Sequence, residues 1–246
     1  MGPLPPRSAR RVEFIGDSYS AGYGVESPSK SNPNIQDASG RNCTDEELNA
    51  YTNGIKAYGP LTAALLGAEY QLNAWSGLGM VRNYNGNTYF LTLPGYYDRV
   101  LQHSEQPKYN FSQWHPHVVV IFLGTNDFST PLGWSEVYKS REELHTAYRA
   151  AYKEFLARIR TAHPGVKFIL AATNLWDSVA GAPNNEMKEQ VQQIIAEENA
   201  AGHNDMTYKL LENITGYGCG WHPDMATQSG WSNDVANTIR SIMGWN

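Results

Sequence analysis

A serine lies at the end of the first apolar run of the chain, in the sequence Val12-Glu-Phe-Ile-Gly-Asp-Ser18. A Gly-Asp-Ser turn at the carboxyl end of a strand can expose the serine hydroxyl while it leaves backbone N–H groups free. The same three residues are common in ordinary β-turns, so a purely structural turn is the competing interpretation. Ser18 is therefore a candidate nucleophile whose assignment depends on partners elsewhere in the chain.

Three further segments carry the residue types that such a nucleophile needs. A serine hydroxyl requires a base within hydrogen-bond reach, and histidine is the side chain with a suitable pKa near neutrality. Attack on an ester creates an oxyanion, which requires N–H donors already directed at it. The candidate segments are Trp75-Ser-Gly-Leu-Gly79, Gly124-Thr-Asn-Asp127 and Cys219-Gly-Trp-His-Pro-Asp224.

The elements that would position these segments alternate between strand and helix. Short apolar runs predict five strands, at 12–16, 69–75, 117–123, 166–172 and 206–211. The run at 117–123 is continuously apolar, as expected of a parallel strand that is covered on both faces. Three- and four-residue periodicity predicts helices at 58–66, 140–161, 184–201 and 227–243. The alternation predicts an α/β fold, a three-layer α/β/α sandwich with a five-stranded parallel sheet.

Two long segments interrupt this alternation, at 19–53 and 77–97, and both are rich in Gly, Asn, Ser and Tyr. Long loops within a compact domain are usually functional or disordered. Because both follow predicted strands at their carboxyl ends, we expect them to lie over the site. Residues 1–11 are interpreted as a linker or an artificial end, and residues 12–246 as one domain.

Composition excludes several classes of partner. The chain has 246 residues, of which 12% are aromatic and 17% charged, and its formal net charge is −5. This balance provides no basic surface for nucleic acid or for an anionic membrane, and it suits sugars or polar polymers better. No stretch approaches the length of a membrane-spanning helix, and the N-terminal residues lack the apolar region of a signal peptide. His115 and His117 lack a third ligand at usable spacing, so no metal is expected, and no cofactor.

In their order along the chain, the four segments resemble the blocks of the SGNH, or GDSL-type, hydrolases, and the resemblance extends from residue 12 over essentially the whole chain. It implies a flavodoxin-like fold with Ser18 as nucleophile and His222 as base. It assigns the oxyanion hole to the backbone N–H groups of Ser18 and Gly77 and to the side-chain amide of Asn126, with Gly79 as the alternative to Gly77.

The chain departs from that pattern at the residue that usually orients the catalytic histidine. Most members have an aspartate three residues before the histidine, and this chain has Cys219 there. We therefore predict a Ser-His dyad, in which a backbone carbonyl before His222 holds the second ring nitrogen. Asp224 and Asp205 stay open as carboxylates that would restore a triad.

The finer resemblance is to carbohydrate esterase family two, whose members remove acetyl groups from plant polysaccharides. It is carried by the segments Lys56–Pro60, Gly67–Tyr70, Ala74–Gly79, Val81–Asn83 and Gly218–Pro223. That family uses Ser-His dyads and an aromatic residue that stacks on sugar, a role that the resemblance carries to Trp221. Its members commonly have an N-terminal β-sandwich, which is absent from this chain or was trimmed away.

Two cysteines permit one disulfide, and a Cys43–Cys219 bridge is the simplest interpretation of the pair. The sequence as a whole predicts a secreted, monomeric serine acetylesterase that acts on acetylated polysaccharide through an acyl-enzyme. Two alternatives stay open. One is an SGNH lipase, esterase or thioesterase for other small acyl esters, and the other is a glycan-binding protein with weak residual esterase activity.

Overall fold

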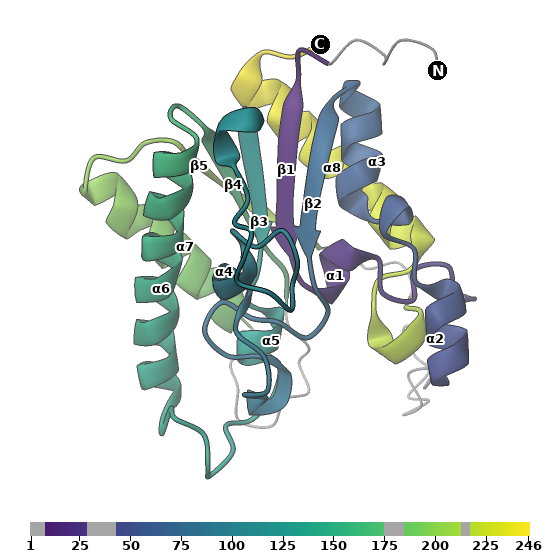
Figure 1. Cartoon of the computed structure of the whole chain (residues 1–246), viewed down its shortest axis with the longest axis vertical. Helices are drawn as coiled ribbons and strands as arrows, with labels where there is room; N and C mark the ends of the chain where they lie inside the picture. Colours follow the sequence, from purple (N-terminus) through teal and green to yellow (C-terminus); the bar gives the residue numbers. More distant parts are fainter. Residues whose placement is uncertain (1–7, 29–42, 175–184, 213–216) are drawn as a thin grey trace.

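A computed structural model of the chain describes residues 8–28, 43–174, 185–212 and 217–246, the side chain of Trp221 excepted (Figure 1). Five strands form one sheet in the order β2-β1-β3-β4-β5, and every neighbouring pair is parallel. They are β1 (Arg11–Gly16), β2 (Glu69–Ala74), β3 (Val118–Phe122), β4 (Lys167–Ala172) and β5 (Met206–Leu210). The five predicted strands are confirmed, each within about one residue of its expected bounds.

Helices cover both faces of this sheet. One face carries α3 (Tyr58–Leu66) and α8 (Met225–Met243), and the other carries α6 (Arg141–Ala162) and α7 (Glu186–Ala200) (Figure 1). These are the four helices that the apolar periodicity predicts. The expected three-layer α/β/α sandwich is confirmed, and its strand order reverses between β1 and β3. Ligands in open α/β folds bind at such a switch point, beyond the carboxyl ends of the strands.

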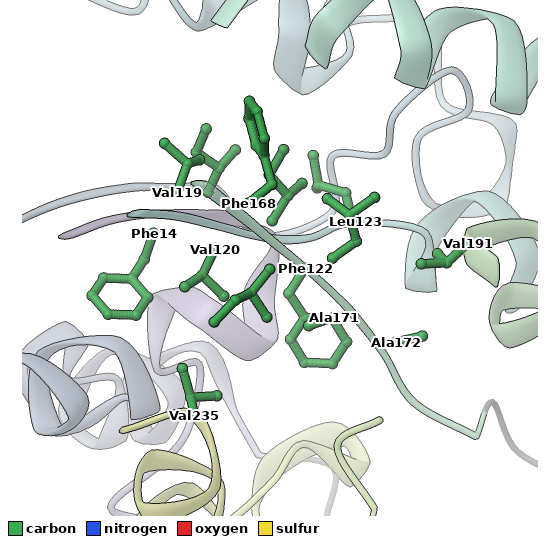
Figure 2. Packing of buried hydrophobic residues seen from close by; sticks show 14 of the residues in the cluster. Phe14, Val119, Val120, Phe122, Leu123, Phe168, Ala171, Ala172, Val191 and Val235 are labelled. Carbon is green, nitrogen blue, oxygen red and sulfur yellow. The ribbon is translucent and has the colours of Figure 1, made fainter. Parts of the chain in front are cut away.

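The core explains why β3 has no polar residue. All five residues of β3 are buried, because successive side chains point to opposite faces and each face meets a helical layer. Figure 2 shows Val119 and Phe168 on one side of the sheet and Phe14 and Val120 on the other. On the second side Trp231 of α8 packs edge-on against Phe122, with ring centroids 5.7 Å apart.

Shorter helices lie between these strands and helices. They are α1 (Ser18–Ala21), α2 (Asp45–Tyr51), α4 (Leu93–Tyr96) and α5 (Thr125–Phe128), with 3₁₀ turns η1 (Gly54–Lys56), η2 (Tyr84–Gly86), η3 (Phe111–Gln113) and η4 (Cys219–Trp221). Helix α2 begins with a capping box, in which Thr44 and Glu47 exchange side-chain and backbone hydrogen bonds. Part of the 19–53 segment lies outside the described residues.

The two cysteines form a disulfide, with a Cα–Cα distance of 5.4 Å between Cys43 and Cys219, which confirms the predicted pairing. The bridge joins the segment before α2 to η4, 176 residues later in the chain. It therefore anchors the turn that precedes His222.

At the N-terminus, β1 starts at Arg11, and Arg10 Nη1 donates to the carbonyl oxygens of Leu66 and Asn246. The linker predicted for residues 1–11 lies outside the described residues up to residue 7. Within the described part of the chain, the helices do not combine the length and apolarity required to cross a membrane.

Candidate active site

Ser18 is the first residue of α1, directly beyond the carboxyl end of β1. Asp17 forms the N-cap, and its Oδ1 accepts a hydrogen bond of 3.0 Å from the Tyr19 backbone N–H. The Asp17 carbonyl also accepts from the N–H groups of Ser20 and Ala21. Asp17 therefore holds the turn through both its side chain and its carbonyl oxygen. This turn fixes the Ser18 hydroxyl at the edge of the sheet between β1 and β3.

His222 reaches Ser18 from the other end of the chain. Its Nε2 lies 2.7 Å from Ser18 Oγ, and its Nδ1 lies 3.0 Å from the carbonyl oxygen of Gly220. One tautomer satisfies both contacts, with the proton on Nδ1 donated to Gly220 and with Nε2 accepting the serine proton. This is the geometry that a general base requires.

The protonation state of His222 suits the same task. Burial lowers its pKa to about 4, and the backbone hydrogen bonds of Gly220 and Cys219 oppose this effect. The imidazole is therefore neutral near neutral pH, so its Nε2 lone pair is free to take a proton.

The two carboxylates that stayed open as orienters have other partners, which corrects that alternative. Asp205 comes just before β5, at the amino end of that strand, whereas Ser18 lies beyond the carboxyl end of β1. Both Asp205 oxygens accept hydrogen bonds from Arg160, of 2.8 and 2.9 Å. Asp224 caps α8, and its Oδ1 accepts a hydrogen bond of 2.9 Å from the Thr227 N–H. Within the described residues, the hydrogen-bond partner of His222 Nδ1 is a carbonyl oxygen.

Two of the three expected oxyanion donors are unengaged. The backbone N–H groups of Ser18 and Gly77 donate to no atom of the described residues. Gly77 has a φ of 84°, a conformation that favours glycine. The alternative donor, the Gly79 N–H, already donates to Asn83 Oδ1 at 3.1 Å. A Cβ on Gly79 would also lie 2.1 Å from the Arg82 carbonyl oxygen, so close packing explains that glycine.

Asn126, the third expected donor, lies in α5 beyond β3 and is buried. Its Nδ2 donates to the Leu78 carbonyl oxygen at 2.8 Å and makes a longer contact of 3.3 Å with Asp17 Oδ2. Thr125 Oγ1 donates to the same carboxylate oxygen. Burial raises the pKa of Asp17 to about 7, and the Thr125 hydrogen bond opposes the rise. Asn126 thereby joins the turn of Asp17 and Ser18 to the segment that contains Gly77.

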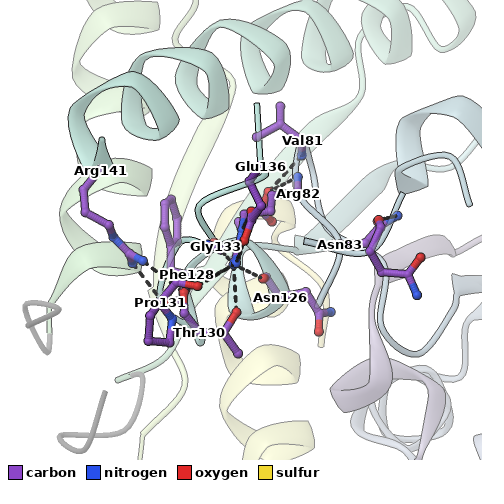
Figure 3. A network of polar contacts seen from close by, with 12 residues as sticks. Val81, Arg82, Asn83, Asn126, Phe128, Thr130, Pro131, Gly133, Glu136 and Arg141 are labelled. Atoms are coloured by element: carbon purple, nitrogen blue, oxygen red, sulfur yellow. Dashed lines mark hydrogen bonds and ion pairs between the residues drawn. The ribbon is translucent and has the colours of Figure 1, made fainter. Parts of the chain in front are cut away.

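A buried ionic network holds residues 77–83, which we call the Gly loop. Asp127 accepts hydrogen bonds from three consecutive N–H groups of this loop, those of Met80, Val81 and Arg82, at 2.8 to 2.9 Å. Arg82 is not among the predicted site residues. In the structure it is buried, pairs with both oxygens of Glu136, and donates to carbonyls at residues 126, 127, 130 and 131 (Figure 3).

Two tyrosines, which sequence reasoning missed, contact the ring of His222. The rings of Tyr19 and Tyr23 have centroids 5.2 and 4.2 Å from that of His222. Trp221, the predicted sugar-binding residue, belongs to η4, and its side chain lies outside the described part of the structure.

The two histidines that were considered as metal ligands, His115 and His117, have hydrogen-bond partners of their own. His115 Nδ1 lies 3.1 Å from His163 Nδ1, and His117 Nδ1 accepts from the Arg11 N–H. Within the described ranges, no three His, Cys, Asp or Glu side chains are grouped so that they could hold a metal ion.

Comparison with known proteins identifies the family. The profile of the GDSL-like lipase/acylhydrolase family matches residues 14–238. The chain belongs to this family. The expected SGNH resemblance is thereby confirmed, and the match includes both Ser18 and His222.

Curated relatives narrow the resemblance within the family. An acetylxylan esterase/glucomannan deacetylase of Cellvibrio japonicus (strain Ueda107) is 40% identical over 218 residues, which are 89% of this chain and 55% of the relative. The cellulase/esterase CelE of Acetivibrio thermocellus is 30% identical over 98% of this chain and 26% of its own length. The chain thus spans about half the length of the first of these relatives and about a quarter of the second.

Solved structures agree with the curated relatives. A carbohydrate esterase, described as having an active site with divergent catalytic and non-catalytic binding functions, matches with a TM-score of 0.86 and 37% identity, over 99% of this chain and 72% of that one. A family two carbohydrate esterase from Clostridium thermocellum in complex with cellohexaose matches with a TM-score of 0.79 and 27% identity, over 99% and 67%. The resemblance to carbohydrate esterase family two is confirmed.

Proposed function

We propose that this chain is a serine esterase that removes acetyl groups from plant polysaccharides of the acetylxylan or acetylglucomannan type. The observation that carries the proposal is the contact of 2.7 Å between Ser18 Oγ and His222 Nε2, at the switch point of the sheet. The similarity to an acetylxylan esterase/glucomannan deacetylase supports the choice of substrate.

The first half of the reaction forms an acyl-enzyme. Ser18 Oγ attacks the acetyl carbonyl carbon while His222 Nε2 takes the hydroxyl proton. The oxyanion lies against the Ser18 and Gly77 N–H groups, and Asn126 Nδ2 exchanges its long contact with Asp17 for this oxygen. The intermediate then breaks its bond to the sugar oxygen, which receives the proton from His222. The products are acetyl-Ser18 and the free sugar hydroxyl.

The second half reverses the proton transfers with water. His222 Nε2 removes a proton from a water molecule, and the water oxygen attacks the acetyl-Ser18 carbonyl. The same three donors stabilise the second oxyanion. Acetate leaves and Ser18 regains its proton from His222, so the cycle needs no cofactor.

A Ser-His dyad suits this ester chemistry. The Gly220 carbonyl accepts a hydrogen bond from His222 Nδ1 and so orients the ring. Because this carbonyl is neutral, it stabilises the imidazolium less than a carboxylate does. The ester's alkoxide leaving group departs more easily than the amine of a peptide. Weaker support for the base is therefore tolerable in an esterase.

The surroundings of the site favour a sugar polymer. Exposed aromatic rings lie on the loops beside the Gly loop: Tyr84, which is 55% exposed, donates its N–H to Gly77, and Trp134, which is 94% exposed, lies two residues before Glu136. Exposed aromatic rings provide apolar faces for sugar rings. We place the protein outside the cell, supported by the Cys43–Cys219 disulfide, since such bonds persist in oxidising compartments.

A second candidate is glycan binding with weak residual esterase activity. It is favoured by the similar carbohydrate esterase whose active site is described as having non-catalytic binding functions, and by the similar enzyme in complex with cellohexaose. In that case the protein would bind cello-oligosaccharides and release little acetate.

The test measures acetate release from acetylated xylan and acetylated glucomannan. It also measures kcat/KM for a series of nitrophenyl esters of increasing acyl length. The proposal predicts release from both polysaccharides and a decline in kcat/KM beyond the acetyl ester. Higher kcat/KM for long acyl chains or thioesters would instead support the lipase or thioesterase alternative. Binding of cellohexaose without acetate release would support the glycan-binding candidate.

A further inference from the structure

The imidazole of His222 contacts two tyrosine rings, and the two contacts differ in geometry. The Tyr23 ring is nearly stacked on it, with centroids 4.2 Å apart and planes inclined by 35°. The Tyr19 ring meets it edge-on, at 5.2 Å and 81°. Tyr19 is buried and also contacts Phe122 and Trp231 of the core. Tyr23, by contrast, is only half-buried and belongs to the turn that ends α1.

The backbone around Tyr23 fixes its ring at that place. Gly22 ends α1 in the left-handed conformation, and the Tyr23 N–H donates to the Ser18 carbonyl oxygen at 3.2 Å. The next residue, Gly24, packs so tightly on η4 that an added Cβ would lie 2.6 Å from the Cys219 Cβ. The turn that contains Tyr23 thus bears directly on the turn that contains Gly220.

His222 needs this support because it acquires a positive charge during the reaction. When Nε2 takes the Ser18 proton the ring becomes an imidazolium, and its Nδ1 partner is the neutral Gly220 carbonyl oxygen. The face of an aromatic ring attracts a cation and holds a flat partner in a defined plane. A stacked ring can therefore provide part of what a carboxylate provides in a triad.

Other ionisable groups lie around this pair. Asp17 precedes Ser18 at the N-cap of α1, and Asp224 caps α8 two residues after His222. Burial is the main cause that raises the pKa of the Tyr23 hydroxyl. Electrostatic interactions with Asp45 of α2 and Tyr84 of η2 raise this pKa further. Tyr23 is therefore a neutral phenol near neutral pH, and its contribution to His222 comes from the ring face.

We propose that Tyr23 is a positioning residue for the catalytic base, holding the His222 imidazole in plane between Ser18 and Gly220 and stabilising the imidazolium. The inference rests on the proposed roles of Ser18 and His222 as nucleophile and base. It assigns to an aromatic side chain the support that a carboxylate gives in a triad.

The experiment compares Tyr23→Leu, Tyr23→Met and Tyr23→Phe with Tyr70→Leu, a matched control at an exposed tyrosine of β2. Two substrates are followed by acid release in a pH-stat: ethyl acetate, which has neither a sugar nor an aromatic ring, and acetylated xylan. We expect Tyr23→Leu and Tyr23→Met to lower kcat/KM roughly 2- to 30-fold, mainly through kcat, and Tyr23→Phe to stay within about twofold of wild type. The acid limb of the pH profile should move to lower pH in the Leu and Met variants, because their imidazolium is less stable.

Three results would overturn the inference: both apolar variants matching wild type, Tyr23→Phe falling as far as Tyr23→Leu, or a loss confined to acetylated xylan. The first result would mean that Tyr23 does not support His222. The second would assign the support to the Tyr23 hydroxyl, and the third would mean that Tyr23 contacts the sugar. If the wild-type protein hydrolyses neither ester, the proposed esterase function fails instead. Near-UV circular dichroism identifies any variant that misfolds, and Tyr23→Met provides a second apolar substitution.

Discussion

The Gly loop depends on Asp127, and Asp127→Asn tests this dependence. The carboxylate is fully buried and accepts three backbone hydrogen bonds, of 2.9, 2.8 and 2.9 Å, from residues 80–82. Burial raises its pKa to about 6, while these N–H groups and Arg82 oppose the rise, so it is mainly ionised at neutral pH. Its charge strengthens all three bonds.

The loss of stability expected for Asp127→Asn follows from these three hydrogen bonds. In Asp127→Asn one amide oxygen still accepts from Val81 and Arg82, without the charge, and each of these bonds weakens by about 1 kcal/mol. The amide NH₂ then faces the Met80 N–H, a donor opposite a donor, at a cost of about 2 kcal/mol. We expect a loss of about 3 to 5 kcal/mol in the free energy of unfolding.

Urea titration followed by circular dichroism measures this loss, with Asp98→Asn as the control. Asp98 pairs with Lys108 and Arg158 at the surface, so the same substitution there should cost less than about 1 kcal/mol. Activity should fall at least about tenfold in folded Asp127→Asn, since the Gly77 donor moves with its loop. A loss below about 1 kcal/mol together with wild-type kcat/KM would refute this reasoning.

The pKa of His222, the disulfide and the buried carboxyl group of Glu13 give the remaining predictions. Because burial lowers the pKa of His222 from 6.5 to about 4, kcat/KM should decline only as the pH approaches about 4, and a decline centred near 6.5 would contradict this. Replacing Cys43 and Cys219 by alanine should cost about 3 to 5 kcal/mol in urea titration and lower kcat, since the bridge anchors η4; an unchanged midpoint would be inconsistent with that role. Burial raises the pKa of Glu13 from 4.5 to about 7, so its contribution to stability is complete below about pH 4.5 and is lost as the pH rises through about 7. Urea titrations should therefore show Glu13→Gln gaining about 2 to 3 kcal/mol relative to wild type from about pH 5 to about pH 8, whereas a pH-independent difference would oppose it.

Sequence reasoning predicted the sheet well because each strand has a strong local signal. The run at 118–122 is uniformly apolar, and buried parallel strands require that pattern. Helix α2 was missed inside the long 19–53 segment, although Thr44 and Glu47 have the spacing of a capping box. A local signal was therefore present, and the Gly- and Ser-rich surroundings outweighed it.

The parts of the site that could be predicted are those in which the residue type itself determines the chemistry. Cys219 in place of an acid indicated a carbonyl partner for the histidine, and the structure gives that partner as Gly220. The Arg82–Glu136 ion pair could not be predicted, because the two residues are 54 positions apart in sequence. Only tertiary packing brings them together, so no local sequence pattern indicates the pair. Tyr23 was missed for the same reason, because its contact with His222 depends on how two distant turns meet.

Acetate release from acetylated xylan, measured side by side for wild type and Ser18→Ala, is the direct test of Ser18 as the nucleophile. Loss of the hydroxyl removes the nucleophile and leaves the fold and the oxyanion donors in place. We expect rapid release by wild type and essentially none by the folded variant. Release by Ser18→Ala at a rate close to that of wild type would contradict the assignment of Ser18 as the nucleophile.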